Sequence, residues 1–140
     1  MNKFQLLSKT TGNLKKKGYK IKITLNEPRS NPLFEVSKGD KKIYIVICEA
    51  GIKTTKYPKI VFCGISPKIQ SLIEIEKVYE IIIDFQPSKP RFILVKLDST
   101  NYRRNKIDYI IYNLNRPDYS DFFNTENIQE LINEIQNVIK

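Results

Sequence analysis

Two glutamates and a lysine are the residues of this chain with the most evident catalytic chemistry. Glu35 and Glu49 lie in neighbouring apolar stretches, and Lys53 follows closely. Paired carboxylates supply the hard oxygen ligands that Mg²⁺ prefers, and a lysine can stabilise a hydroxide that attacks a phosphodiester. We therefore take Glu35 and Glu49 as candidate metal ligands, and Glu35, Glu49 and Lys53 as candidate catalytic residues. The alternative is that both glutamates are ordinary carboxylates at strand ends that offset nearby lysines.

The composition excludes several other kinds of catalytic site. The 140 residues include no histidine, which excludes a Ser-His-Asp triad, a Cys-His dyad and any His-ligated metal. The five glycines form neither a Walker A motif nor a Gly-x-Gly-x-x-Gly motif. Both cysteines, Cys48 and Cys63, lie in apolar runs and are expected to be buried thiols, because no secretory signal favours the alternative of a disulfide between neighbouring strands. Carboxylate chemistry in a basic surrounding therefore remains.

The positive charge is concentrated in the first part of the chain. There are 24 lysines and arginines against 15 aspartates and glutamates, so the net charge is +9. Residues 1–60 hold 14 basic and 4 acidic residues, whereas residues 61–140 hold 10 and 11. A block of this kind produces a directed field if it forms one face of the folded domain. We expect contacts to nucleic-acid phosphates from Lys15, Lys16, Lys17, Lys20, Lys22, Lys41 and Lys42, and from a second cluster at Arg103 and Arg104.

Other interpretations of the same lysines stay open. They could form a solvated surface, and Lys15 to Lys17 could simply serve as cations at a helix C-terminus. An acidic protein or an anionic membrane surface would also attract them.

The elements that position these residues follow from apolar periodicity. Helices are expected over residues 4–17 and 67–79 and from Thr125 onward, where the apolar stripe is the clearest of the chain. Strands are expected over residues 19–25, 33–37, 42–48, 59–63, 80–85, 91–97 and 107–114. This order predicts one α/β domain over residues 1–140, with a mixed central sheet flanked by helices in three layers.

Targeting signals are not evident in the sequence. The N-terminal residues lack the apolar segment of a signal peptide, and the longest apolar run, Ile43–Cys48, is too short to span a bilayer. We therefore expect a cytoplasmic protein without a membrane partner.

Residues 31–51 read Asn-Pro-Leu-Phe-Glu-Val-Ser-Lys-Gly-Asp-Lys-Lys-Ile-Tyr-Ile-Val-Ile-Cys-Glu-Ala-Gly. With the expected helix and strand before them, they resemble the PD-(D/E)xK, or restriction-endonuclease-like, nucleases. In that family a Pro-Asp pair is followed by an acidic-x-Lys motif in the next strand. Leu33 stands where the family has Asp, and Val46 and Cys48 stand where it has its acidic residue and Lys. The resemblance covers residues 4–85 and implies a restriction-endonuclease-like fold, a nucleic-acid context and a degenerate active site.

The sequence therefore predicts a nucleic-acid-binding domain, with DNA favoured over RNA, that needs no cofactor. One alternative is an active Mg²⁺-dependent endonuclease that uses the shifted residues Glu35, Glu49 and Lys53. Another is a protein-interaction or regulatory module that binds no nucleic acid. Assembly into a homo-oligomer is left open.

Overall fold

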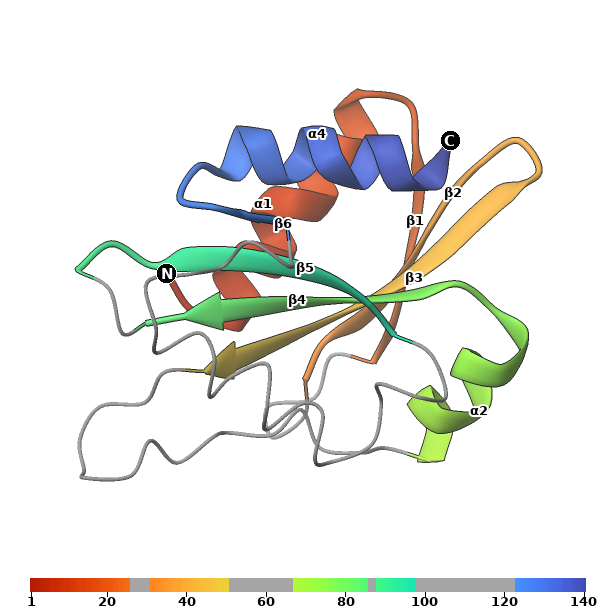
Figure 1. Cartoon of the computed structure of the whole chain (residues 1–140). Helices are drawn as coiled ribbons and strands as arrows, with labels where there is room; N and C mark the ends of the chain where they lie inside the picture. The colour runs from red at the N-terminus through yellow and green to blue at the C-terminus, as the bar shows by residue number, and fades with distance from the viewer. Residues whose placement is uncertain (26–30, 51–66, 86–87, 98–122) are drawn as a thin grey trace.

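The structure, a computed structural model, describes residues 1–25, 31–50, 67–85, 88–97 and 123–140. Within these residues the chain forms three helices and one six-stranded sheet (Figure 1). The elements in chain order are α1 (Lys3–Lys16), β1 (Lys20–Leu25), β2 (Leu33–Lys38), β3 (Lys41–Ala50), α2 (Pro67–Ile75), β4 (Val78–Asp84), β5 (Arg91–Leu97), β6 (Phe123–Thr125) and α4 (Ile128–Ile139).

The strands lie in the sheet in the order in which they occur in the chain, β1-β2-β3-β4-β5-β6. Neighbouring strands run antiparallel except for the central pair, β3 and β4, which are parallel. Parallel strands need a crossover connection, and α2 lies in the connection between these two. The sheet is therefore mixed, as the sequence predicts.

Helix α1 has well-defined ends. Asn2 caps its N-terminus by accepting hydrogen bonds from the backbone N–H groups of Phe4 and Gln5, and the Gln5 side chain accepts one from Asn2 in return. At the other end Gly18 has a φ of 93°, a left-handed conformation that glycine adopts without strain. The chain then turns directly into β1.

One face of the sheet is covered by α1 and α4 (Figure 1). Apolar side chains of both helices, such as Leu14 and Ile132, pack there on Phe34, Ile45 and Ile81 of the central strands. All five side chains are fully buried. The amphipathic stripe of α4 therefore serves to cover the sheet.

The other face of the sheet carries a second apolar cluster that includes α2. Ile69 of α2 packs there with Val46, Cys48 and Ile82 of the central strands. Leu72 and Ile73 of the same helix lie against this cluster. Strands β3 and β4 are thus apolar on both faces, which is why their sequences read as nearly continuous apolar runs.

The predicted helices and strands are confirmed for most of the described residues, with two corrections. The helix predicted over residues 67–79 ends at Ile75, and the strand predicted from residue 80 begins at Val78. The Lys77 carbonyl already accepts a hydrogen bond from the Tyr44 N–H at 2.9 Å, so pairing with β3 replaces the next helical turn. The last helix begins at Ile128 rather than at Thr125, because Thr125 belongs to the short strand β6, which the sequence analysis missed.

Other predictions fall outside the described residues. They include the strands predicted over residues 59–63 and 107–114. No helix of the described part of the chain is both long and apolar enough to cross a membrane. The cytoplasmic location stays a prediction.

Truncation of a buried α4 side chain will destabilise the fold. Ile135 is fully buried, and Ile135→Ala is expected to lower the free energy of unfolding by about 2–5 kcal/mol. Urea denaturation followed by circular dichroism measures the loss. Gln129→Ala, on the exposed side of the same helix, is the control and is expected to change stability by about 0.5 kcal/mol or less. Equal effects of the two substitutions would contradict the assigned burial of α4.

Candidate functional site

The structure does not bring the two candidate metal ligands together. Glu35 lies opposite Tyr44 in the β2–β3 pairing, and Glu49 is five residues further along β3. An odd separation places the two side chains on opposite faces of the sheet, and five residues span about 17 Å. Metal–oxygen ligand distances are about 2.0–2.6 Å, so Glu35 and Glu49 cannot hold one ion.

Each of these glutamates has a local contact instead. Glu35 Oε1 lies 4.0 Å from Lys42 Nζ on the face that carries α2. Glu49 Oε1 accepts a hydrogen bond of 3.4 Å from the backbone N–H of Lys3 at the start of α1. The third candidate catalytic residue, Lys53, lies outside the described residues. Among the residues that are described, no group of three or more Cys, Asp or Glu side chains is arranged to hold a metal ion.

The three positions that correspond to the nuclease motif do lie on one face. Leu33 pairs directly with Val46, and Cys48 follows two residues later on the same face. All three side chains are fully buried in the cluster under α2. None of the three side chains carries a charged group.

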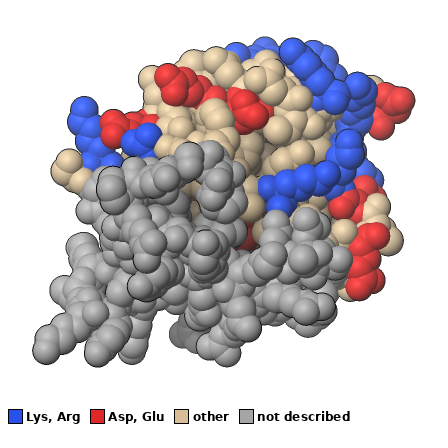
Figure 2. Space-filling view, in the orientation of Figure 1, with Lys and Arg blue, Asp and Glu red and all other residues tan. Residues whose placement is uncertain are grey.

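A set of lysines gathers at one end of the sheet, where the β2–β3 hairpin turns. We call this set the lysine end, and it consists of Lys15, Lys16, Lys17, Lys20, Lys22, Lys38, Lys41 and Lys42. Figure 2 shows blue side chains concentrated at the upper right, over the end where the hairpin and the α1–β1 turn lie in Figure 1. Seven of the eight were predicted to contact nucleic acid, and the fold places them around one end. The other two predicted contacts, Arg103 and Arg104, lie outside the described residues.

Strand pairing explains why lysines distant in the sequence meet here. Lys38 and Lys41 pair across the tip of the hairpin, and Lys20 pairs with Ser37 next to them. The Lys38 ammonium lies 4.9 Å from the centroid of the Tyr19 ring, a cation–π contact. This contact joins the hairpin tip to the turn after α1, so that Lys15 to Lys17 lie beside the hairpin.

The lysines of the lysine end outnumber the acidic residues beside them, which include Glu35, Asp40 and Glu76. Lys42 forms ion pairs with Glu76 at 3.3 Å and with Glu35 at 4.0 Å, and its hydrogen bond to Glu76 holds its pKa above the usual value. The other seven lysines form no ion pair within the described part of the chain. Asp40 lies in the hairpin turn itself and is exposed. The end is therefore strongly positive and accessible to a polyanion.

A cavity of about 630 Å³ opens beside the hairpin. It is lined by residues 40–43 of the hairpin, by residues 74–77 at the end of α2 and just after it, and by Ile139 and Lys140. Lysines and carboxylates both line it, over an apolar floor formed by Ile43 and Ile139. The mixed charge gives this cavity no clear preference for an anion or a cation.

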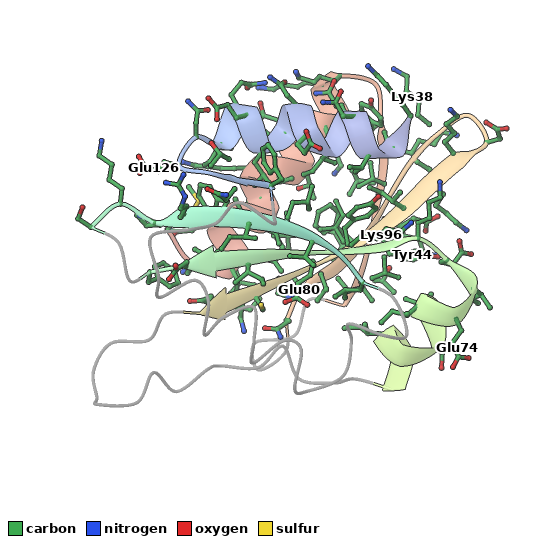
Figure 3. All side chains as sticks on the ribbon, viewed as in Figure 1. Lys38, Tyr44, Glu74, Glu80, Lys96 and Glu126 are labelled. Atoms are coloured by element: carbon green, nitrogen blue, oxygen red, sulfur yellow. The ribbon has the colours of Figure 1, made fainter. Side chains whose placement is uncertain are left out.

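Sequence reasoning missed two buried acidic residues of β4, Glu80 and Asp84, which are 1% and 2% exposed. Glu80 lies in the middle of β4, between Val46 of β3 and Val95 of β5, and its side chain is 1% exposed. Burial raises the pKa of its carboxyl group to about 8, because the charged form loses its hydration. In Figure 3 Glu80 projects from β4 toward the side on which α2 lies, away from Lys38. The signal in the sequence for Glu80 was an acidic residue directly before the apolar run of residues 81–83 in β4.

Cys48 contacts this carboxyl group. Its sulfur lies 3.1 Å from Glu80 Oε1. Cys48 is disulfide-bonded, so the expectation of a buried free thiol is wrong for this residue. Because a disulfide sulfur carries no hydrogen, the protonated carboxyl group is the only possible donor in the contact. The contact therefore agrees with a neutral Glu80. Cys63 lies outside the described residues.

Comparison of the chain with protein-family models, with curated proteins and with solved structures gives no significant match. The function is therefore argued from the residues and their arrangement.

The buried carboxyl group of Glu80 predicts how stability depends on pH. The folded pKa of about 8 exceeds the ordinary value of 4.5, so the folded protein binds a proton that the unfolded chain releases between these two values. The contribution of Glu80 to stability is complete below about pH 4.5, falls as the pH rises toward 8, and levels off above it. Glu80→Gln removes this loss of stability with rising pH. At pH 9 the free energy of unfolding of the variant is expected to exceed that of the wild type by an amount on the order of 3–5 kcal/mol.

Urea denaturation at a series of pH values, without reductant, measures this difference. Glu74→Gln makes the same chemical change on an exposed side chain of α2 and is expected to keep the wild-type pH profile. If Glu80→Gln and the wild type show parallel profiles from pH 5 to 9, Glu80 does not titrate as a buried group.

Proposed function

We propose that this chain is a nucleic-acid-binding domain and that the lysine end is its contact surface. The observation that supports the proposal most directly is the accumulation of eight lysines around the hairpin tip and the end of α1, of which Lys42 alone is paired with an acid among the described residues. Cations held close together repel one another, so this arrangement lowers the stability of the fold. A ligand with many closely spaced negative charges removes that repulsion on binding.

A nucleic acid is the ligand that such a surface suits best. Its phosphates carry condensed counterions, and each lysine that neutralises a phosphate releases some of them. The lysines come from both faces of the hairpin: Lys38 and Lys41 face the side of α1 and α4, and Lys42 and Lys22 face the side of α2. A surface that curves around the end of the sheet can follow a backbone of phosphates, whereas one small anion would engage few of these lysines.

We further propose that the fold is a three-layer, restriction-endonuclease-like one with a degenerate active site. The order of helix α1, strand β1 and the β2–β3 hairpin entered through Pro32 supports this assignment. So does the position of the motif residues, with Leu33, Val46 and Cys48 on one face of the hairpin.

The hairpin tip of the lysine end lies far from these motif positions. Lys41 at the hairpin tip is five residues from Val46 and seven from Cys48 along the extended strand β3, about 17 and 23 Å. A nucleic acid held at the tip would therefore not be presented to the buried motif positions. This supports binding without cleavage by the described residues.

Binding of nucleic acid at the lysine end predicts a steep dependence on salt. The logarithm of the association constant for a fluorescently labelled 20-base-pair DNA, measured by anisotropy, should fall linearly with the logarithm of salt concentration, by about 0.9 for each phosphate contacted. Substitution of Lys15, Lys16 and Lys17 by Gln is expected to weaken binding at least about tenfold at 0.1 M salt and to reduce the slope by up to about 3.

A control triple variant, Lys3→Gln, Lys9→Gln and Lys89→Gln, removes the same charge away from the lysine end and is expected to stay within about threefold of the wild type. Equal losses in the two triple variants would show a net-charge effect without a site. Absent binding, or binding unaffected by salt, would reject the proposed function. Competition by polyglutamate as effective as that by DNA would favour an acidic protein partner instead.

No Mg²⁺-dependent cleavage is expected. Glu35 and Glu49 lie on opposite faces of the sheet, and the motif positions Leu33 and Val46 offer no ligand atoms in their side chains. Supercoiled plasmid incubated with the protein and excess Mg²⁺ should stay supercoiled on an agarose gel. Cleavage that disappears in Glu49→Ala but persists in the control Glu74→Gln would establish the endonuclease alternative.

A further inference from the structure

The side chains of the lysine end differ from those of a surface that reads bases. Single-stranded nucleic acids are bound largely by stacking bases on exposed aromatic rings. The two described tyrosines at this end do not offer such rings. Tyr19 is 9% exposed and has the Lys38 ammonium 4.9 Å from its ring centroid, and the half-buried ring of Tyr44 has Lys42 at 5.6 Å.

Side-chain amides described near this end make hydrogen bonds within their own helices. Asn137, in the last turn of α4 close to the cavity beside the hairpin, donates to Glu134 Oε2 at 3.4 Å. Specific readout of bases relies mostly on the planar groups of Arg, Asn and Gln, which donate and accept in pairs. The basic residues here are all lysines, which act as point charges. The amide nearest in sequence, Asn13, donates its side-chain hydrogen to the Lys9 carbonyl oxygen at 2.8 Å.

A surface of lysines without stacking or bidentate groups responds to the density of phosphate charge. A DNA duplex carries one charge per 1.7 Å of its axis, about twice the density of one strand, and releases more counterions for each phosphate neutralised. We infer that the lysine end recognises the phosphate backbone of a double helix, with little regard to base sequence. This inference rests on the proposed function and specifies which form of nucleic acid the surface prefers.

The Lys38–Lys41 pair is the part of the surface that this preference depends on most. The two lysines lie directly opposite each other across the hairpin, and like charges in this position destabilise a strand pair. Neither forms an ion pair within the described residues. Phosphates of a bound duplex supply the negative charge that this pair lacks.

Binding of four labelled DNAs by anisotropy tests the inference: two 20-base-pair duplexes of unrelated sequence, and one single strand from each. We expect the duplexes to bind within about threefold of each other, and about tenfold or more tighter than the single strands at equal salt. Lys38→Gln with Lys41→Gln should weaken duplex binding about tenfold. Lys38→Arg with Lys41→Arg should retain it, and Lys3→Gln with Lys89→Gln is the control.

The possible failures can be told apart. If no DNA of any form binds, the proposed function itself is rejected. Three other results would leave DNA binding intact but show that the inferred recognition of the duplex backbone is wrong. They are single strands that bind as tightly as duplexes, a preference of more than about tenfold for one duplex sequence, and a Lys38→Gln, Lys41→Gln variant that binds duplex as tightly as the wild type does. Circular dichroism of each variant confirms that a loss of binding is not a loss of fold.

Discussion

The parallel pairing of β3 with β4 is the constraint on which the rest of the structure depends. It lies at the centre of the sheet, and each of its two faces is covered by an apolar cluster, one under α1 and α4 and the other under α2. The pairing begins at Tyr44, so the first three residues of β3 extend beyond β4 and end in the hairpin tip. The same register places Glu80 between Val46 and Val95, where its carboxyl group has no contact with water. One pairing thus determines both the exposed lysines and the buried acid.

The exposed lysines and the buried Glu80 affect the free energy of folding in different ways. The lysines of the hairpin and of α1 repel one another on the surface, where salt and solvent screen the repulsion. Glu80 remains neutral in the core, because ionisation there would cost far more than protonation. Neither feature improves packing, and within the described residues Lys42 is the one lysine of the lysine end that has an acidic partner. The proposed binding function rests on the first of these features, the exposed lysines.

Apolar periodicity was sufficient to predict most of the described elements, because α4, β3 and β5 bury faces whose spacing is visible in the sequence. It failed where long-range pairing decided the outcome. Val78 and Tyr79 continue an apparent helical stripe, but hydrogen bonding to β3 makes them a strand. For the site, the block of lysines could be predicted, since hairpin and helix ends are exposed. Whether Glu35 and Glu49 share a face could not, because one residue of register reverses every side chain of a strand. Glu80 was missed for the related reason that burial depends on both neighbouring strands.

The most direct test of the account is to locate the bound DNA on the protein. Two-dimensional ¹H–¹⁵N NMR spectra, recorded as a 20-base-pair duplex is added, report which backbone amides sense the ligand. The account predicts that shifts concentrate in residues 15–22 and 37–42, around the hairpin tip and the end of α1. Shifts concentrated instead around Arg91 and Glu126 at the start of α4, or spread evenly over the surface, would contradict it.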